Sequence, residues 1–270
     1  LRSKFSIKNT NGYRLDAFID SVEIYRQPLG AEDIQRLYRY GGTALYLNLD
    51  EPPGSQTFAD ALGRAPANCS GDACPVSGVP ARIDQGAQFD GVNDYLETPV
   101  DVFHRSGAYA LWFKADAPTG GLFAVVNQAP STALDRSLDL LGGQVCMTIY
   151  DGVKQEQRCT TGAALNDGRW HHVAYSFGPV ANGQQLYVDG ALRLSGAQKV
   201  AAFNGRYRAW AGRTTTTFRG VLDDVRYFNK ELTPADVQAI YQNAPQFRLR
   251  FDEAVGATGF KDDAGGLVAQ

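Results

Sequence analysis

The sequence predicts an all-β protein, and both its composition and its patterning indicate this class. The 270 residues include 29 Gly, 13 Tyr and 14 Phe but one Met, a balance that suits strands and tight turns. Segments in which apolar and polar residues alternate recur between turn signals, as expected of half-buried strands. These segments read AQFDGVNDYLETP, AYALWFKADAP, GLFAVVNQ, HHVAYSFGP, QQLYVDGALRLSG, YRAWAGR and GVLDDVRYF.

Two local signals predict a hairpin and a helix. Asp189 and Gly190, in LYVDGALRL, favour the positive φ angles of a type I′ turn, so this segment should form a hairpin. The segment LTPADVQAIYQN predicts one helix, with Thr233 as its cap, Pro234 in the first position and Asp236 placed for a capping box. Its apolar stripe should lie against a sheet as a lid and consists of Val237, Ile240 and Tyr241.

The cysteines favour disulfides over a metal site. They form two close pairs, Cys69 with Cys74 and Cys146 with Cys159, and neither pair has zinc-finger spacing. If Tyr150 lies opposite Gln155 across a hairpin loop, the antiparallel register also places the second pair face to face. We therefore expect two disulfides and an oxidising, extracellular setting. The alternative is four buried free thiols.

Charge and hydropathy exclude two classes of partner. The net charge is -3 and the pI is near 5.6, and no Lys/Arg cluster is interleaved with aromatic residues, so binding to nucleic acid is not expected. No apolar run approaches the length of a membrane-spanning helix, so membrane insertion is not expected either. The chain opens without an initiating Met or a signal peptide, which we interpret as the edge of a fragment.

The chain repeats itself at the spacing of a whole domain. FIDSVEIYRQPLGAEDIQRLY matches VLDDVRYFNKELTPADVQAIY, which aligns Asp20 with Asp223. LYLNLDEPPGSQTFADALG matches FRLRFDEAVGATGFKDDAGG, which aligns Asp50 with Asp252. The repeat predicts three parts. They are the C-terminal part of a preceding repeat in 1–40, a complete domain in 41–243 and the start of a following repeat in 244–270.

Six successive motifs identify a family resemblance. They read ALYLNLDE, FDGVNDYLETP, ALWFKAD, DGRWHHVAYSF, LYVDGALRLSG and FRGVLDDVRYFNKELTPADVQAIY. In this order they resemble bacterial laminin G-like (concanavalin A-like) domains over essentially all of 41–243. The resemblance implies a jelly-roll sandwich of two antiparallel sheets, with one short helix per repeat and with the first and last strands paired. The loop NCSGDACP is not part of the usual pattern.

The adjacent histidines in NDGRWHHVAYSF are better explained as scaffold than as a metal site. In an extended strand, His171 and His172 point to opposite faces and cannot share a metal ion. A zinc pair on a strand would need histidines at i and i+2, where this sequence has Val173 and Ala174. The third histidine, His104, is expected in a loop.

Catalytic patterns are absent from the sequence. There is no G-x-S-x-G elbow, P-loop or dinucleotide fingerprint. Some glycosidases share the sandwich, and they need two strand-borne carboxylates that face one groove. LDDVRYF places adjacent acids on opposite faces, and Asp90 and Asp94 are separated by turn residues. We therefore expect that the chain is not an enzyme.

Three aspartates form a candidate site for structural Ca²⁺, which takes carboxylate and carbonyl oxygens. If the first strand runs antiparallel to the last, Asp50 comes close to Asp223, and Asp60 in the following loop can close the site. The flanking copies repeat these aspartates, whereas Ser21 replaces Asp224, so Asp223 is the preferred ligand of the two. The alternative is that these acids cap turns and edge strands.

Several aromatic side chains are candidates for stacking on sugar rings, although such residues more often belong to a sandwich core. The candidates are Tyr95, Tyr150 and Trp210. Trp112 and Trp170, on predicted central strands, are assigned to the core.

The resemblance implies a non-catalytic module of a large secreted or cell-surface tandem-repeat protein, active in adhesion and binding a glycan or protein. One alternative is a purely structural repeat of an extracellular filament or spacer, whose partners are neighbouring repeats or head-to-tail copies of the chain. A second alternative is an accessory domain of a secreted glycoside hydrolase. The sequence does not identify the ligand.

Overall fold

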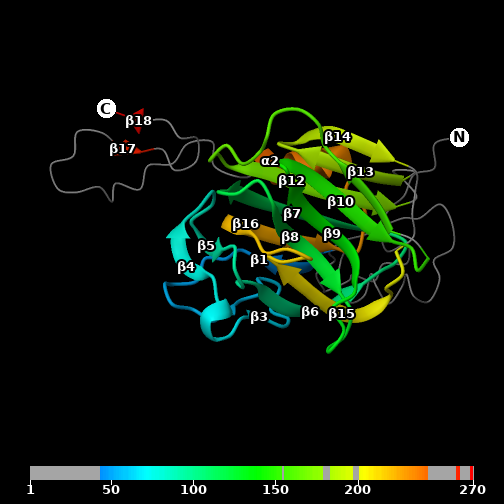
Figure 1. The fold of residues 1–270 in the computed structure, drawn as a ribbon, viewed down its shortest axis with the longest axis horizontal. Helices are drawn as coiled ribbons and strands as arrows, with labels where there is room; N and C mark the ends of the chain where they lie inside the picture. The colour runs from blue at the N-terminus through cyan, green and yellow to red at the C-terminus, as the bar shows by residue number, and fades with distance from the viewer. Residues whose placement is uncertain are drawn as a thin grey trace, which may run out of the picture. The chain divides into compact units, whose positions relative to one another are not determined.

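The structure is a computed structural model that describes residues 43–153, 155–178, 183–196 and 201–242. It also describes two short paired strands, β17 (Phe260–Lys261) and β18 (Val268–Ala269). The predicted flanking repeats, 1–40 and 244–270, otherwise lie outside the described residues. The rest of the described chain forms two facing antiparallel sheets, as the sequence predicted (Figure 1).

Sheet A has the order β14-β13-β12-β7-β16-β5-β4, and β1 also pairs with β16. The pairing of β1 with β16 is antiparallel, with Leu47 opposite Val225, so the expected contact between the first and last strands of the sandwich is confirmed. The strands of sheet A are β1 (Thr43–Leu47), β4 (Val76–Pro80), β5 (Gln85–Asp90), β7 (Gly107–Ala115), β12 (His171–Gly178), β13 (Gly183–Val188), β14 (Ala191–Gly196) and β16 (Arg219–Phe228).

Sheet B has the order β11-β10-β9-β8-β15-β6-β3-β2. A single turn of 3-10 helix, η1 (Gly71–Ala73), follows β3. The strands of sheet B are β2 (Thr57–Phe58), β3 (Ala67–Asn68), β6 (Leu96–Val102), β8 (Gly120–Val126), β9 (Leu134–Leu141), β10 (Gln144–Tyr150), β11 (Gln155–Cys159) and β15 (Gly205–Ala211).

The main core lies between the two sheets and is rich in aromatic rings. Tyr109 of sheet A packs against Phe123 of sheet B, with ring centroids 4.9 Å apart. Arg136 is fully buried in this core. Its guanidinium forms an ion pair with Asp135 and donates to the Tyr227 hydroxyl. A buried charge requires such partners, because its desolvation is otherwise too costly.

The helix α2 (Pro234–Gln242) covers the outer face of sheet A. Its capping box is confirmed, because the Thr233 amide donates to Asp236 and the Asp236 amide donates to Thr233 Oγ1. Val237 is fully buried on alanines of the sheet. Tyr241 stacks on Trp112 at 5.5 Å. Trp112 is therefore buried, but it lies under the helix and not between the sheets.

The predicted turns and disulfides are confirmed. Asp189 and Gly190 have φ angles of 52° and 75° in the β13–β14 hairpin. Cys146 lies opposite Cys159 in the β10–β11 register, and both predicted disulfides are present. The assignment of Trp170 to the core is wrong, because Trp170 precedes β12 and is half-buried.

Candidate ligand-binding site

His171 and His172 point to opposite faces of β12, as predicted, and each has a packing role. The His172 ring packs against Trp112 at 5.1 Å and against Tyr241 at 5.9 Å. It is almost completely buried, and this burial lowers the pKa of His172 to about 3. Neither ring nitrogen has a hydrogen-bond partner among the described residues. His172 is therefore a neutral part of the packing beneath α2.

His171 links the loop before β12 to the turn between β13 and β14. Its Nδ1 lies 2.9 Å from Asp189 Oδ2, and its Nε2 lies 3.1 Å from Asp167 Oδ1. Burial by itself lowers the pKa of His171, but the two carboxylates outweigh it and raise the pKa above the usual value. The third histidine, His104, lies in the loop between β6 and β7, as expected.

Two of the three aspartates predicted to bind calcium hold the same turn. Asp50 Oδ1 accepts a hydrogen bond from the Gln85 amide at 2.9 Å, and Asp223 Oδ2 accepts one from the Ile83 amide at 2.6 Å. Burial raises the pKa of Asp223 well above its usual value, and the nearby carboxylates of Asp224 and Asp50 raise it further. This environment disfavours a bare carboxylate at position 223.

The third aspartate, Asp60, is held by a different segment. Its Oδ1 accepts from the amides of Tyr46 at 3.0 Å and Leu62 at 3.1 Å. In the part of the chain that the structure describes, no three His, Cys, Asp or Glu side chains converge to hold a metal ion. However, three buried acceptors have no hydrogen-bond donor among the described residues: Asp60 Oδ2, Gln85 Oε1 and Asp223 Oδ1. Such oxygens fit a bound cation or water, and calcium binding stays a prediction.

A further pair of acids on β9 was missed in the sequence, although the pattern DRSLD was the signal for it. Asp135 and Asp139 lie four residues apart on one face of the strand and are both buried. Four residues span about 13 Å, which exceeds the separations of both glycosidase mechanisms. Asp135 accepts from the Ala202 amide, and Asp139 accepts from the Ser137 hydroxyl. Both carboxylates are thus already engaged in hydrogen bonds that stabilise the fold.

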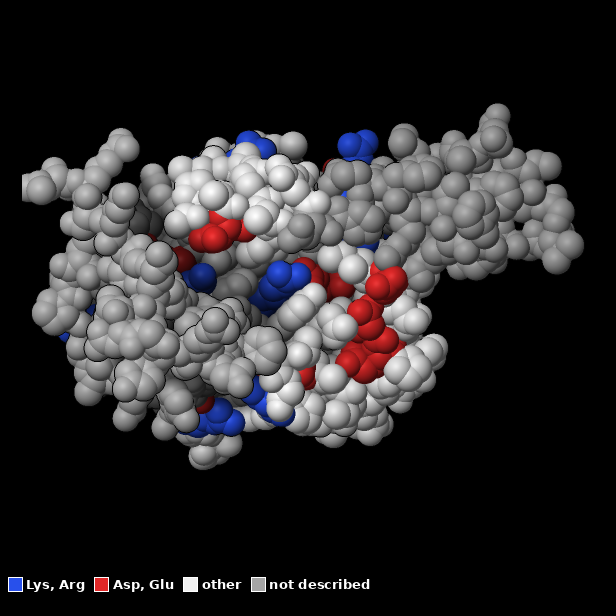
Figure 2. All heavy atoms as spheres, turned by 180° about the vertical axis from the view of Figure 1, so that it is seen from behind, with Lys and Arg blue, Asp and Glu red and all other residues white. Residues whose placement is uncertain are grey.

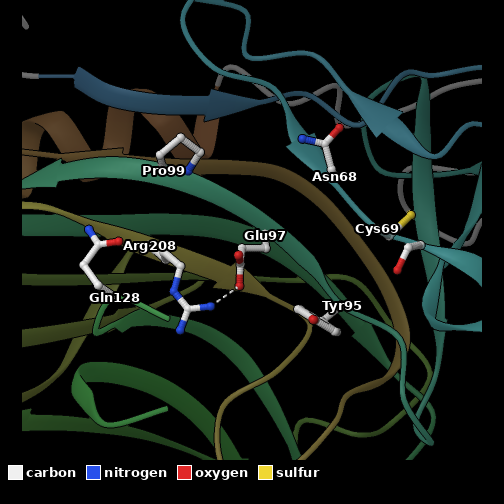
Figure 3. Close-up of a pocket in the computed structure, with 8 residues that line it drawn as sticks. Asn68, Cys69, Tyr95, Glu97, Pro99, Gln128 and Arg208 are labelled. Atoms are coloured by element: carbon white, nitrogen blue, oxygen red, sulfur yellow. Dashed lines mark hydrogen bonds and ion pairs between the residues drawn. The ribbon is translucent and has the colours of Figure 1, made fainter. Parts of the chain in front are cut away.

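A pocket of about 440 Å³ opens on sheet B (Figure 3). Four segments of the fold line it: the end of β3 with the disulfide loop that follows, the start of β6, the loop after β8, and the strand β15. The lining residues are Asn68, Cys69, Ser70, Tyr95, Glu97, Pro99, Gln128 and Arg208. Because these segments are far apart in sequence, only the folded chain creates the pocket.

An ion pair orders one wall of this pocket. Glu97 Oε2 accepts from Arg208 Nη1 at 2.7 Å and from Trp210 Nε1 at 2.6 Å. Arg208 also donates to the carbonyl oxygens of Asn127 at 2.8 Å and Ser131 at 2.6 Å. The wall is thus rigid before any ligand arrives, and preorganisation reduces the entropy lost on binding.

The three aromatic residues predicted to stack on sugar rings differ in exposure and position. Tyr95 is half-buried and lines the pocket, and its hydroxyl makes no hydrogen bond to the described part of the protein. Trp210 is buried and meets Tyr95 edge to face at 5.7 Å. Tyr150 does not line the pocket, and its hydroxyl donates to the Gly152 carbonyl. Tyr95 is therefore the accessible ring.

The Cys69–Cys74 disulfide supports the rim of the pocket. The loop that it closes includes η1, and the Ala73 carbonyl accepts a hydrogen bond from the Tyr95 amide at 3.3 Å. At the start of this loop, Asn68 pairs with Glu97 across the β3–β6 ladder. The disulfide loop therefore helps to position two residues that line the pocket, Tyr95 and Glu97.

The surface charge is uneven. Figure 2 shows acidic side chains grouped on the right of the described surface, whereas Lys and Arg side chains form separate spots. On this face, the described residues form no continuous basic surface of the kind that nucleic-acid phosphates require. No helix of the described chain is long and apolar enough to span a membrane.

The two-sheet sandwich and its motifs match a known family. A laminin G-type model, described as the concanavalin A-like lectin/glucanases superfamily, matches residues 90–238. This match covers more than half of the chain, and the chain belongs to this family. A search of curated protein sequences found no match.

Solved structures with a similar fold include binding proteins and an enzyme. A Trypanosoma rangeli sialidase in complex with 2,3-difluoro-KDN has a TM-score of 0.55 at 17% identity, over 74% of this chain and 32% of the sialidase. The binding domain of botulinum neurotoxin DC, in complex with rat synaptotagmin II, has a TM-score of 0.56 at 13% identity, over 77% and 53%. The botulinum neurotoxin type G receptor binding domain has a TM-score of 0.54 at 13% identity, over 74% and 51%.

The match to these structures is partial. The chain spans about a third of the sialidase and about half of each neurotoxin domain. At these identities the likeness shows the fold alone.

Proposed function

We propose that the chain is a non-catalytic binding and adhesion module of a secreted or cell-surface protein. Its ligand, a glycan or a protein, binds in the pocket lined by Tyr95, Glu97, Gln128 and Arg208. The observation that carries this proposal is a preordered polar wall beside an accessible aromatic ring. Binding sites commonly combine apolar surface with a few fixed polar groups.

Two further observations support an extracellular binding role. All four cysteines are paired in disulfides, and disulfides persist in oxidising compartments. The buried carboxylates on β9 are too far apart for a glycosidase pair and already hold other groups. Together these features favour binding over catalysis.

A ligand screen with a matched variant tests this proposal. The 270-residue chain is screened on an array of glycans and extracellular proteins, and hits are measured by calorimetry. Tyr95→Ala should weaken binding at least tenfold, because it removes the ring that lines the pocket. Tyr150→Ala should leave affinity unchanged, because Tyr150 lies on sheet B but outside the pocket. Absence of any ligand, or equal effects of both variants, would contradict the proposed site.

Calcium is proposed as a structural cofactor of the same module. Asp50 and Asp223 would supply carboxylates, and Gln85 would supply an amide oxygen. These residues meet at one turn, and two of their buried oxygens, Asp223 Oδ1 and Gln85 Oε1, have no donor among the described residues. Asp60, which a separate segment holds, is the least favoured of the three predicted ligands. A cation there would offset the cost of burying the Asp223 carboxylate.

The repeated motifs of the sequence favour a second candidate function, a structural repeat in an extracellular filament or spacer. In this case the partners are neighbouring repeats or head-to-tail copies of the chain. Electron microscopy of the purified native protein tests this candidate. Ordered polymers together with no binding on the array would favour the structural role over ligand binding.

A further inference from the structure

A second pocket, of about 300 Å³, is formed by two loops. One loop, 91–95, joins β5 to β6, and the other, 212–218, joins β15 to β16. The Thr217 hydroxyl donates to the Gly91 carbonyl at 2.7 Å and so ties the loops together. The pocket is lined by Val92, Asn93, Arg213, Thr215, Thr216 and Thr217.

The two pockets are adjacent, since a side chain that lines one contacts a side chain that lines the other. Tyr95 lines the first pocket and Arg213 lines the second. The Arg213 guanidinium carbon lies 4.8 Å from the ring centroids of both Tyr95 and Trp210. Cation–π contact of this kind orients a guanidinium without using its hydrogen-bond donors. Arg213 is therefore held in place with donors available for a ligand.

Arg213, in the loop after β15, differs in its partners from the two arginines of β15. Arg208 forms an ion pair with Glu97, and Arg206 forms one with Asp101. Within the described residues, no carboxylate pairs with Arg213, which is half-buried. A guanidinium in this position favours an anionic ligand group, since its planar fork matches a carboxylate or sulfate.

The remaining lining of the second pocket also suits an anion. Asn93 and Thr215 contribute an amide and a hydroxyl, and neither side chain has a hydrogen-bond partner in the described part of the chain. No acidic residue lines this pocket. The nearest acids in sequence, Asp90 and Asp94, instead accept hydrogen bonds from the backbone amides of Val92 and Asp90.

We propose that the second pocket binds the anionic group, a carboxylate or a sulfate, of an acidic saccharide. A neighbouring sugar ring of the same ligand lies on Tyr95 in the first pocket. This inference rests on the proposed binding function and names the class of its ligand. Glu97 lines the first pocket and disfavours a second negative charge there. The preferred ligand is thus charged at one end and neutral at the other.

Matched ligands test this inference on the 270-residue chain. Calorimetry compares a disaccharide that contains glucuronic acid with its glucose counterpart, and a sulfated disaccharide with its unsulfated form. At least one acidic member should bind about tenfold or more tightly than its neutral partner, as expected of a charge-assisted contact. Its advantage should shrink as NaCl rises, because salt screens exposed charges.

Two variants assign this preference to one side chain. Arg213→Gln should remove the preference for the acidic ligand but retain binding of the neutral one. Arg206→Gln, which changes an exposed arginine of β15, should leave both affinities unchanged. Circular dichroism checks the fold of each variant, and the salt titration of the unmodified chain keeps the test valid if Arg213→Gln does not fold.

The outcomes separate this inference from the proposed function. If acidic and neutral saccharides bind equally, or if Arg213→Gln retains the preference, the inference is overturned while the binding function stands. Binding of an acidic peptide but of no acidic saccharide also overturns it. If no glycan or protein binds at all, both proposals fail.

Discussion

The outer faces of the two sheets both carry aromatic and charged side chains, but among the described residues these side chains are sealed by a helix on one sheet and line a pocket on the other. On sheet A, Trp112 and His172 lie under α2 and are almost completely buried. The Arg82 guanidinium carbon lies 4.8 Å from the Trp112 ring. On sheet B, Trp210 is also buried, but Tyr95 and Arg208 above it line a pocket.

The difference between these faces lies in what covers them. On sheet A, a helix seals the aromatic residues. Buried polar atoms there, such as Trp112 Nε1 and both His172 nitrogens, have no hydrogen-bond partner in the described part of the chain. On sheet B, Glu97 and Arg208 satisfy each other at the edge of an accessible pocket. An aromatic residue on a sheet therefore indicates a binding site only where no other segment covers it. Changes on sheet A should mainly alter stability, and changes on sheet B should mainly alter binding.

The largest expected effect is on the covered face. Trp112→Ala should lower the free energy of unfolding by about 3–5 kcal/mol, because it leaves a cavity beneath α2. Tyr95→Ala, on the open face, should lower it by about 1 kcal/mol or less. Urea denaturation of both variants measures the two values. Similar losses would remove the distinction between a structural face and a binding face.

Acid should destabilise the covered face through His172. The pKa of His172 is lowered to about 3 in the folded chain, whereas an unfolded histidine titrates near 6.5. Between these values the unfolded state binds the extra proton, so stability is present above about pH 6.5 and falls as the pH falls towards 3. From pH 7 to pH 4 this contribution amounts to about 3 kcal/mol.

The variant His172→Phe isolates this effect. Its loss of stability between pH 7 and pH 4 should be smaller than that of the unmodified chain, because the titrating ring is gone. His171→Gln is the adjacent control. The pKa of His171 is raised, so its contribution is present below about pH 6.5 and declines as the pH rises through the folded pKa. Identical acid sensitivity of His172→Phe and the unmodified chain would contradict a neutral buried His172.

Calcium should act where the β4–β5 turn meets β16, with a smaller effect. The melting temperature should rise when calcium replaces a chelator, because an ion that binds only the folded state stabilises it. Asp223→Asn should lose this response and should be no less stable than the unmodified chain in chelator, since it avoids burying a charge. Asp224→Asn should keep the response.

Asp224 is a suitable matched control for this experiment. It is the adjacent aspartate on the same strand, but its carboxylate forms an ion pair with Arg226 at 2.8 Å. Asn tolerates its positive φ of 55° better than Ala does. Equal calcium responses in the two variants would count against Asp223 as a ligand.

The smallest stability effect is expected at the rim of the binding pocket. Gln128 is exposed and donates to the Arg206 carbonyl at 2.6 Å. Gln128→Ala should therefore change stability by about 0.5 kcal/mol or less, yet weaken ligand affinity severalfold. Parallel calorimetry and denaturation compare the two readouts. A large loss of stability without loss of affinity would assign Gln128 to the scaffold.

Local features of this protein were determined by the sequence alone. The Asp189–Gly190 turn, the capping box at Thr233 and the opposite orientation of His171 and His172 all follow from backbone dihedral preferences and the two-residue period of a strand. The Cys146–Cys159 pair follows from the same register argument. These features depend on residues close together in sequence, so pattern and spacing were sufficient to predict them.

Only the tertiary structure decided which surfaces are covered and which side chains meet. Residues as distant as Asn68, Gln128 and Arg208 line one pocket. Trp112, assigned to the core because it lies on a predicted central strand, is buried under α2. Asp60 carries the same carboxylate as Asp50 but is held by another segment. Periodicity predicts on which side of its strand a residue lies, whereas packing between distant segments determines whether that side is sealed or open to a ligand.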